Sequence, residues 1–317
     1  MNRRPWLSII IPVCNRFDLL GRTLDSVLSQ RAGNVEVIIS DDGSKDSIEQ
    51  FVEQYSGHGM KPRLVLSRSN NGVSAARNKG AKAARGKWLY FLDSDDELVP
   101  GALEKIQAAT GCRDAKLIYF HAQSICGNGE VRFFDSQVLP DPLDRSELLT
   151  SEYRPFTQSQ IAVHAASFND IGRFDEQLST GEDFEVWLRM IMHDFKIVHV
   201  ADVLVRKHDG HGKSLSSDYQ KLYDNRRRVW AKHRAALKRI LRPNQYRRWE
   251  FAQLHSLYWL LCVEWHVASR LPGRGATAYL CYRWAMLAIN PPDGRRKDVV
   301  RRLGSTVKHL VFGSSST

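Results

Sequence analysis

An early stretch of the chain reads Leu7-Ser8-Ile9-Ile10-Ile11-Pro12-Val13-Cys14-Asn15. Its apolar part, Leu7–Pro12, is rich in isoleucine and too short for a helix, so it predicts a buried β-strand. Similar strands are predicted further along the first 120 residues, at Val35–Ser40, Arg63–Ser67, Trp88–Leu92 and Lys116–Phe120. Helical patterns fill the gaps, at Asp18–Gln30, Ser47–Tyr55, Val73–Arg85 and Pro100–Ala109. This alternation predicts an α/β, Rossmann-like fold with a mainly parallel sheet covered by helices on both faces.

The rest of the chain changes character near residue 218. Before it, strand-like pieces at 159–164, 196–200 and 204–208 flank a helical pattern that begins at Glu182 and ends near His193. After it, the patterns are helical, over 219–241, 245–270, 275–289 and 295–311. We therefore expect a catalytic domain over 1–218 and a basic, Trp-rich helical region over 219–317.

A segment that contains polar side chains follows each of the first four predicted strands. In chain order the segments are Pro12-Val13-Cys14-Asn15, Asp41-Asp42-Gly43-Ser44, Asn70-Asn71-Gly72 and Asp93-Ser94-Asp95-Asp96. Open parallel sheets bind ligands beyond the carboxyl ends of their strands. These side chains are therefore expected to gather around a ligand at one edge of the sheet.

Asp93, Ser94 and Asp95 predict a metal site after the fourth strand. In an extended segment the side chains of Asp93 and Asp95 point the same way and that of Ser94 points away. Paired carboxylates with open coordination positions suit Mg²⁺ or Mn²⁺, which also binds substrate phosphates and makes a diphosphate a better leaving group. The structural alternative is a polar turn that caps the helix beginning near Pro100.

Two other segments predict contacts with a nucleotide. Asp42, at a strand end, can accept hydrogen bonds from a base or a ribose, although Asp41-Asp42-Gly43-Ser44 also suits a turn and helix cap. Arg77 lies on the first turns of a predicted helix, whose amino end favours anions, and could reach a diphosphate. A solvated arginine on an amphipathic helix is the alternative.

The later motif Gly181-Glu182-Asp183 places acids at the start of a helix. Negative charge is favoured at this position, and Thr180 and Asp183 have the spacing of a capping box. The functional alternative is a general base, because an acceptor hydroxyl must lose its proton as it attacks. His208, at the end of the last predicted strand, is either a metal ligand or phosphate contact or a structural hydrogen-bonding group.

Composition and charge narrow the class of protein. The chain has 317 residues, 43% of them hydrophobic, and its five cysteines form no CxxC pair, which favours reduced thiols in the cytoplasm over a disulfide framework or zinc site. From Arg226 onward there are 19 basic and 4 acidic side chains, against 27 and 31 before it. A basic end with many tryptophans suits an anionic membrane surface, and a helical subdomain packed on the catalytic domain is the alternative.

Taken together, the motifs resemble those of the family 2 glycosyltransferases. The ordered series covers about residues 5–215 and runs through Ser8-Ile9-Ile10-Ile11-Pro12-Val13-Cys14-Asn15, Ser26-Val27-Leu28-Ser29-Gln30, Ser40-Asp41-Asp42-Gly43-Ser44, Asn71-Gly72-x-Ser74-x-Ala76-Arg77-Asn78-x-Gly80, Phe91-Leu92-Asp93-Ser94-Asp95-Asp96 and Gly181-Glu182-Asp183. The resemblance implies a GT-A fold and inverting transfer of a sugar from a nucleotide-sugar, a UDP-sugar here, to an acceptor hydroxyl. It places the acceptor, a glycan or lipid-linked molecule of the cell envelope, at the inner face of the membrane.

The resemblance also assigns roles to the residues of these motifs. They are Pro12 and Asp42 for the base pocket, Arg77 for the diphosphate, Asp93 and Ser94 for the donor, Asp95 with Asp93 and His208 for Mn²⁺ or Mg²⁺, and the Glu182–Asp183 pair for catalysis, with Asp183 as the base. Cys14 departs from the family, in which a tyrosine is usual.

Two other functions are considered. A sugar nucleotidyltransferase would share the fold and the need for a metal, but the loop after the first strand is not glycine-rich. A nucleic-acid-binding protein would use the basic end, but that end carries no known binding motif, so we expect no nucleic acid partner.

Overall fold

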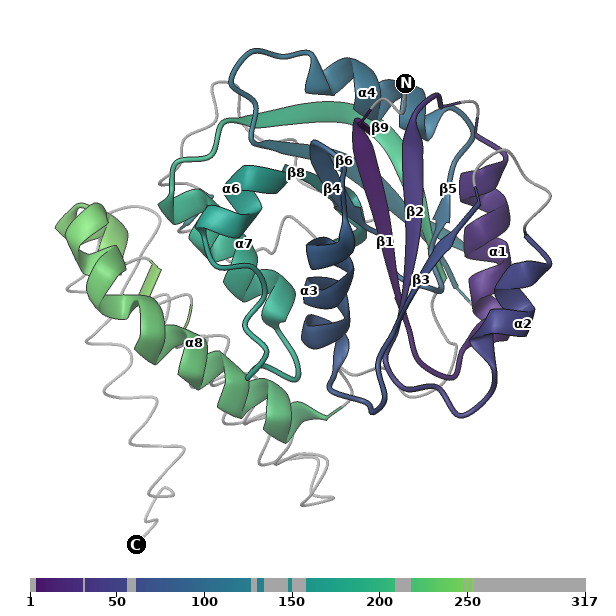
Figure 1. The fold of residues 1–317 in the computed structure, drawn as a ribbon. Coiled ribbons are helices and arrows are strands. Elements are labelled where there is room, and N and C mark those ends of the chain that lie inside the picture. The colour runs from purple at the N-terminus through teal and green to yellow at the C-terminus, as the bar shows by residue number, and fades with distance from the viewer. Residues whose placement is uncertain are drawn as a thin grey trace, which may run out of the picture.

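The computed structural model describes residues 4–30, 32–55, 61–126, 130–133, 148–149, 158–208, 218–247, 249–250 and 253. Within them, nine strands form one sheet, with helices on both sides (Figure 1). The strand order is β3-β2-β1-β4-β8-β6-β9-β5, and β7 pairs with β6 beside this path. The predicted α/β fold is confirmed.

The amino-terminal half of the sheet is parallel. Strand β1 (Leu7–Val13) pairs in parallel with β2 (Val35–Asp41) and with β4 (Trp88–Phe91), and β2 pairs in parallel with β3 (Arg63–Leu66). All seven residues of β1 are buried because both faces of the sheet are covered. This explains why the strand is a continuous apolar run rather than an alternating one.

The other half makes the sheet mixed rather than mainly parallel. Strand β8 (Ile161–His164) lies antiparallel between β4 and β6 (Leu117–Ile125). Strand β9 (Ile197–His208) is parallel to β6 but antiparallel to β5 (Glu97–Leu98). Strand β7 (Val131–Phe133) is also antiparallel to β6.

Strand β9 joins two strands that the sequence predicts separately, at 196–200 and 204–208. Its pairing with β6 shifts register around His121, which faces Val203 while the preceding Phe120 faces Val200. An irregularity of this kind lets a strand bend and continue. Ala201 and Asp202 therefore interrupt the apolar pattern without ending the strand.

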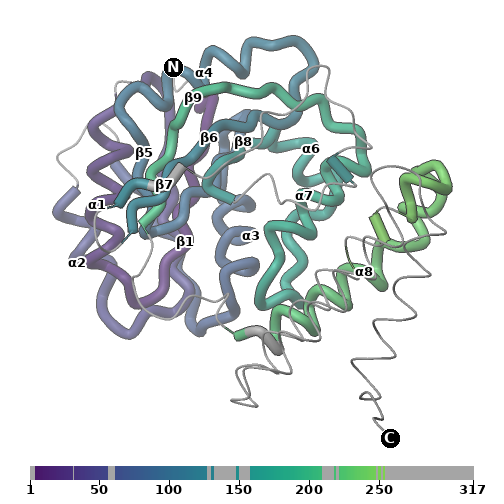
Figure 2. The backbone as a smooth tube through the Cα atoms, turned by 180° about the vertical axis from the view of Figure 1, so that it is seen from behind, coloured from purple at the N-terminus to yellow at the C-terminus, as the bar shows by residue number. Residues whose placement is uncertain are grey.

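Two hydrophobic clusters occupy the two faces of the sheet. One contains side chains of α1 (Phe17–Leu28), α2 (Ile48–Glu53) and α4 (Ala102–Thr110). The other contains side chains of α3 (Val73–Ala83), α6 (Ala165–Asp170) and α7 (Glu182–Met192). Figures 1 and 2 show the two groups of helices on opposite sides of β1–β3.

Helix α8 (Tyr219–Ile240) packs against α7 and closes this side of the molecule (Figure 2). Its Val229 and Leu237 are buried in the same hydrophobic cluster as α7. Among the described residues, no helix has both the length and the apolar character needed to cross a membrane. The predicted helix over 245–270 lies mostly outside the described residues, and those over 275–289 and 295–311 lie wholly outside them.

Candidate active site

The carboxyl ends of three neighbouring strands are joined by hydrogen bonds. After β1, the backbone N–H of Asn15 donates to Ser44 Oγ (2.9 Å), and Asn15 Oδ1 accepts from the backbone N–H of Lys45 (2.9 Å) after β2. Arg16 Nη1 donates to Asp95 Oδ2 (3.1 Å) after β4. The loops that the sequence places at one edge of the sheet therefore meet there.

Asp42 lies just past β2 and holds the start of α3. Its Oδ1 and Oδ2 accept from the backbone N–H of Asn71 (3.0 and 3.1 Å), and Oδ2 also accepts from that of Gly72 (2.7 Å). The side chain is buried, and Oδ1 keeps capacity for a further hydrogen bond. Pro12 is buried inside β1, opposite Ser40 of β2. The base contacts of Asp42 and Pro12 stay predictions.

Arg77 joins the end of β4 to the start of α7. Its Nη2 donates to Asp93 Oδ1 (2.7 Å) and its Nη1 donates to Glu182 Oε1 (2.8 Å). The guanidinium is only 4% exposed, so these are buried, charge-assisted contacts. Two motifs far apart in the sequence thus share one cation. Since both terminal nitrogens of Arg77 bind carboxylates, its contact with a diphosphate stays a prediction.

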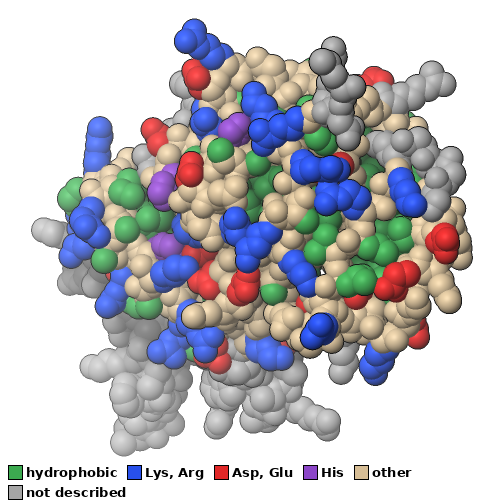
Figure 3. All heavy atoms as spheres, viewed as in Figure 1, with side chains coloured by type: hydrophobic (Ala, Val, Ile, Leu, Met, Phe, Trp, Pro, Cys, Tyr) green, Lys and Arg blue, Asp and Glu red, His purple; other side chains and the backbone are tan. Residues whose placement is uncertain are grey.

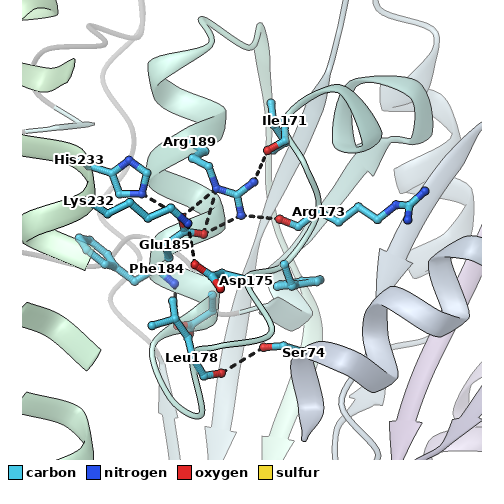
Figure 4. A network of polar contacts seen from close by, with 12 residues as sticks. Ser74, Ile171, Arg173, Asp175, Leu178, Phe184, Glu185, Arg189, Lys232 and His233 are labelled. Carbon is cyan, nitrogen blue, oxygen red and sulfur yellow. Dashed lines mark hydrogen bonds and ion pairs between the residues drawn. The ribbon is translucent and has the colours of Figure 1, made fainter. Parts of the chain in front are cut away.

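Helix α3 also holds the segment that leads into α7. Ser74 Oγ donates to the carbonyl of Leu178 (3.3 Å; Figure 4). One turn later, Asn78 Nδ2 donates to the carbonyl of Phe174 (3.0 Å) and its Oδ1 accepts from the N–H of the same residue (3.0 Å). Ser74, Arg77 and Asn78 are three and four positions apart, so they lie on one face of the helix.

The three carboxylates after β4 each pair with one cation, but their pKa values shift in different directions. Burial raises the pKa of Asp95, and the charge of Asp93 raises it further, against the opposing effect of Arg16. Burial also raises the pKa of Asp96 to about 7, although Lys207 Nζ lies 3.2 Å from its Oδ2. Asp93 behaves differently, because Arg77 and then Lys207 outweigh its burial and lower its pKa.

These residues fit a divalent cation. The side chains of Asp93 and Asp95 are 28% and 24% exposed, whereas Ser94 is buried. The described chain contains no group of three His, Cys, Asp or Glu residues that encloses a metal. Mg²⁺-type sites with nucleotide substrates do not need one, because one or two carboxylates combine with substrate phosphates and waters. A cation here would relieve the repulsion that raises the pKa of Asp95.

The two acids that open α7 differ in their surroundings. Glu182 is buried against Arg77; burial and then the charge of Asp183 raise its pKa, while Arg77 opposes the rise. Asp183 is partly exposed and forms no ion pair within the described part of the chain. Of the two, Asp183 is therefore the carboxylate with room to receive a proton.

His208 lies at the end of β9. Its Nε2 lies 2.7 Å from Glu97 Oε1. Residues 97 and 206 are paired across β5 and β9, which brings these two side chains together. Metal ligation by His208 stays a prediction.

Two residues of the site were missed by sequence reasoning. Ser159 Oγ accepts from the N–H of Asp93 (3.2 Å), and its carbonyl accepts from Tyr90 Oη (2.9 Å). Lys207 pairs with Asp96. Lys207 lies beside His208 at the end of a predicted strand, which was a signal for it, whereas Ser159 gave none because the direction of β8 was not predictable.

Comparisons with known proteins identify the family of the chain. The family described as "Glycosyl transferase family 2" matches residues 8–173. The amylovoran biosynthesis glycosyltransferase AmsB of Erwinia amylovora is 29% identical over 208 residues, covering 63% of this chain and 69% of AmsB. The chain spans 26% and 29% of the length of two longer curated relatives and 62% of the length of a third.

Solved structures show the same fold. The structure of S. aureus TarS 1–349 in complex with UDP-GlcNAc has a TM-score of 0.61 at 19% identity, covering 95% of this chain and 80% of that one. The mannosyltransferase PcManGT from Pyrobaculum calidifontis, in complex with GDP-Man and Mn²⁺, has a TM-score of 0.59 at 15% identity, covering 97% and 88%. With its GT-A fold and a family match over more than half of its length, the chain belongs to glycosyl transferase family 2.

Proposed function

We propose that the protein transfers a sugar, with inversion, from a UDP-sugar to an acceptor hydroxyl of a cell-envelope polysaccharide or glycolipid. The observation that carries the proposal is the shared contact of Asp93 and Glu182 with Arg77, which brings the predicted metal-binding and base motifs into one site. The name of AmsB supports the polysaccharide, and the UDP-GlcNAc bound to TarS supports the donor.

In this proposal, Asp183 takes the proton of the acceptor hydroxyl as its oxygen bonds to the anomeric carbon. The bond from that carbon to the diphosphate breaks on the opposite face, and its electron pair leaves with the phosphate oxygen. Attack from the face opposite the leaving group inverts the anomeric centre. Glu182 stays ion-paired to Arg77 and fixes the turn that presents Asp183.

Asp95 and Asp93 would hold Mn²⁺ or Mg²⁺, whose charge neutralises the departing diphosphate. Asp42 would accept a hydrogen bond from the base through Oδ1, with Pro12 beneath the ring. His208 would supply a further ligand only if its contact with Glu97 opened.

The roles of the acids are tested with Asp183→Asn, Asp95→Ala and the control Asp114→Asn. Asp114 is 77% exposed and remote from the site. With Mn²⁺ and a UDP-sugar, we expect the first two variants to lose sugar transfer by about 10²-fold or more while the control keeps it. EDTA should abolish transfer by the wild type. Full turnover by folded Asp183→Asn would remove the proposed base.

The donor and the stereochemistry need separate measurements. A thermal-shift panel of nucleoside diphosphates with Mn²⁺ should show the largest rise with UDP, because a ligand bound only by the folded state stabilises it. NMR of the released or transferred sugar should show the anomer opposite to that of the donor. Pyrophosphate release from a nucleoside triphosphate would instead indicate a sugar nucleotidyltransferase.

We also propose that α8 holds the protein on the anionic inner face of the membrane. Its outer face exposes basic residues and one acid, Asp224; the basic residues are Lys221, Arg227, Arg228, Arg234, Lys238 and Arg239. Figure 3 shows Lys and Arg side chains along the lower left edge, where α8 lies. Each basic residue near such a surface contributes about 1 kcal/mol.

Liposome sedimentation tests this attachment. The wild type should sediment with vesicles containing anionic lipid and not with purely zwitterionic ones. The triple variant Arg227→Glu, Arg234→Glu, Lys238→Glu reverses charge along one stripe of α8 and should stay in the supernatant. Equal sedimentation of wild type and variant would exclude this face.

A further inference from the structure

Helix α8 contacts the backbone segment that precedes the candidate base. Asn225 Nδ2 donates to Ser179 Oγ (3.1 Å) and to Thr180 Oγ1 (3.0 Å). Asn225 is buried, and the two hydroxyls belong to the residues directly before Gly181, where the chain turns with a φ of 72° into α7. The approach to α7 is therefore held by a side chain of α8.

The residue that follows Asp183 is also covered by α8. The guanidinium carbon of Arg226 lies 4.0 Å from the ring centroid of Phe184, and Arg226 is buried. A cation over an aromatic face is attracted by the negative charge of that face, and more strongly in a desolvated position. Helix α8 thus contacts the chain on both sides of Asp183, at Ser179 and Thr180 before it and at Phe184 directly after it.

Two turns further along, α8 contacts a fully buried carboxylate of α7 (Figure 4). His233 Nε2 and Lys232 Nζ each lie 2.8 Å from Oε1 of Glu185, which has no exposed surface. Lys232 also lies 2.6 Å from Asp175 Oδ2, and Arg189 of α7 binds the other side of Glu185 at 2.6 Å. Through Lys232, α8 ties α7 to the loop that Asn78 and Ser74 hold from the opposite side.

We infer that Asn225, Lys232 and His233 are positioning residues, through which α8 fixes the turn that presents Asp183 to the acceptor. The inference rests on the proposed role of Asp183 as the base. The segment 175–185 is held from one side by α3 and from the other by α8, whose contacts fall at positions 225–226 and, two turns later, at 232–233. A displacement of about 1 Å in a reacting group can reduce a rate by about 10²-fold. The contacts of α8 with segment 175–185 should therefore affect the rate of sugar transfer.

The test compares two matched lysine variants of the full chain. Lys232→Met removes the bridge between Asp175 and Glu185. Lys105→Met removes an ion pair of similar length, 2.7 Å to Asp202, from a similarly exposed lysine on α4. We expect kcat for UDP-sugar turnover to fall by roughly 10- to 100-fold in Lys232→Met, with KM for the donor within about twofold of wild type, and no change in Lys105→Met. Lys232→Arg should restore most of kcat.

A second measurement does not depend on turnover. Hydrogen exchange of amides 179–185 should be faster in Lys232→Met and in Asn225→Ala than in wild type, and unchanged in Lys105→Met. If Asp183→Asn is inactive but both α8 variants match Lys105→Met in kcat and exchange, the inference is overturned. If Asp183→Asn keeps full turnover, the proposed role of Asp183 as the base is refuted instead. The hydrogen-exchange result then still shows whether α8 holds amides 179–185.

Discussion

Replacing Arg77 by methionine should destabilise the protein and abolish sugar transfer. The arginine is 5% exposed and binds Asp93 at 2.7 Å and Glu182 at 2.8 Å. Removing one partner from a buried ion pair costs about 3–5 kcal/mol, because the remaining charge is left uncompensated. Asp93 is 28% exposed and partly solvated, so we expect the lower end, about 3 kcal/mol at pH 7.

Chemical denaturation measures this loss of unfolding free energy, and a thermal scan should show that Tm falls by roughly 6 to 12 °C. The sign of its pH dependence follows from the pKa values. Arg77 favours the ionised form of both acids, lowering the pKa of Asp93 and opposing the burial that raises the pKa of Glu182. The stabilisation is therefore fully present near neutral pH and is lost as pH falls and the carboxylates become protonated.

Arg63→Met is the matched control. Arg63 pairs with Glu36 at the same 2.7 Å but is 41% exposed, so its removal should cost no more than about 1 kcal/mol. If folded Arg77→Met proved as stable as the Arg63→Met control, the two acids would not depend on Arg77. The link between the end of β4 and the start of α7 would then have to be explained otherwise.

Three further predictions concern single contacts. Gly80→Ala places a Cβ 2.5 Å from Ile10 Cγ2 and should lower the free energy of unfolding, measured by chemical denaturation, by about 1–3 kcal/mol. The control Gly33→Ala, whose Cβ would have nothing within 4 Å, should leave stability nearly unchanged. Equal losses of stability in the two variants would contradict the packing of α3 on β1. Asp42→Asn exchanges an acceptor for a donor facing the N–H groups of α3 and should cost about 1–3 kcal/mol, together with weaker UDP binding by calorimetry. Burial opposes ionisation of Glu185, but its bonds to His233 and Arg189 lower its pKa from 4.5 to about 2. The free energy of unfolding of the wild type should therefore exceed that of Glu185→Gln by about 3 kcal/mol above pH 4.5. This difference should disappear as the pH falls toward 2. A gap independent of pH would show that Glu185 is not ionised.

The local features of the fold were predictable from the sequence. The apolar runs around Ile10 and Ile38 are buried on both faces, which gives short continuous apolar segments that are visible in the sequence. The polar loops after these strands were placed correctly because parallel strands share an edge. The helix over 219–241 was predicted from its own pattern and from the proline that follows it.

The partners of the charged side chains were not predictable. Arg77 and Glu182 are far apart in the sequence, and nothing local indicates that a guanidinium on one helix binds a carboxylate at the start of another. The reversal of β8 was hidden for a related reason, since a short apolar run gives no strand direction. The contacts of Lys232 and His233 with α7 were not predictable, because α8 also carries basic side chains on its outward face. The sequence does not show which of its basic residues face the protein.

The reversed direction of β8 has a consequence for how selectivity can change. In a wholly parallel sheet, the residues that reach the ligand edge are the last ones of each strand. Because β8 runs the other way, its ligand edge is reached by the short helical turn at Gln158–Gln160 that enters the strand, and this turn touches Asp93 through Ser159. Insertions or substitutions in the turn before β8 can therefore change which ligand is bound at this edge of the sheet, while the strand itself keeps its place between β4 and β6.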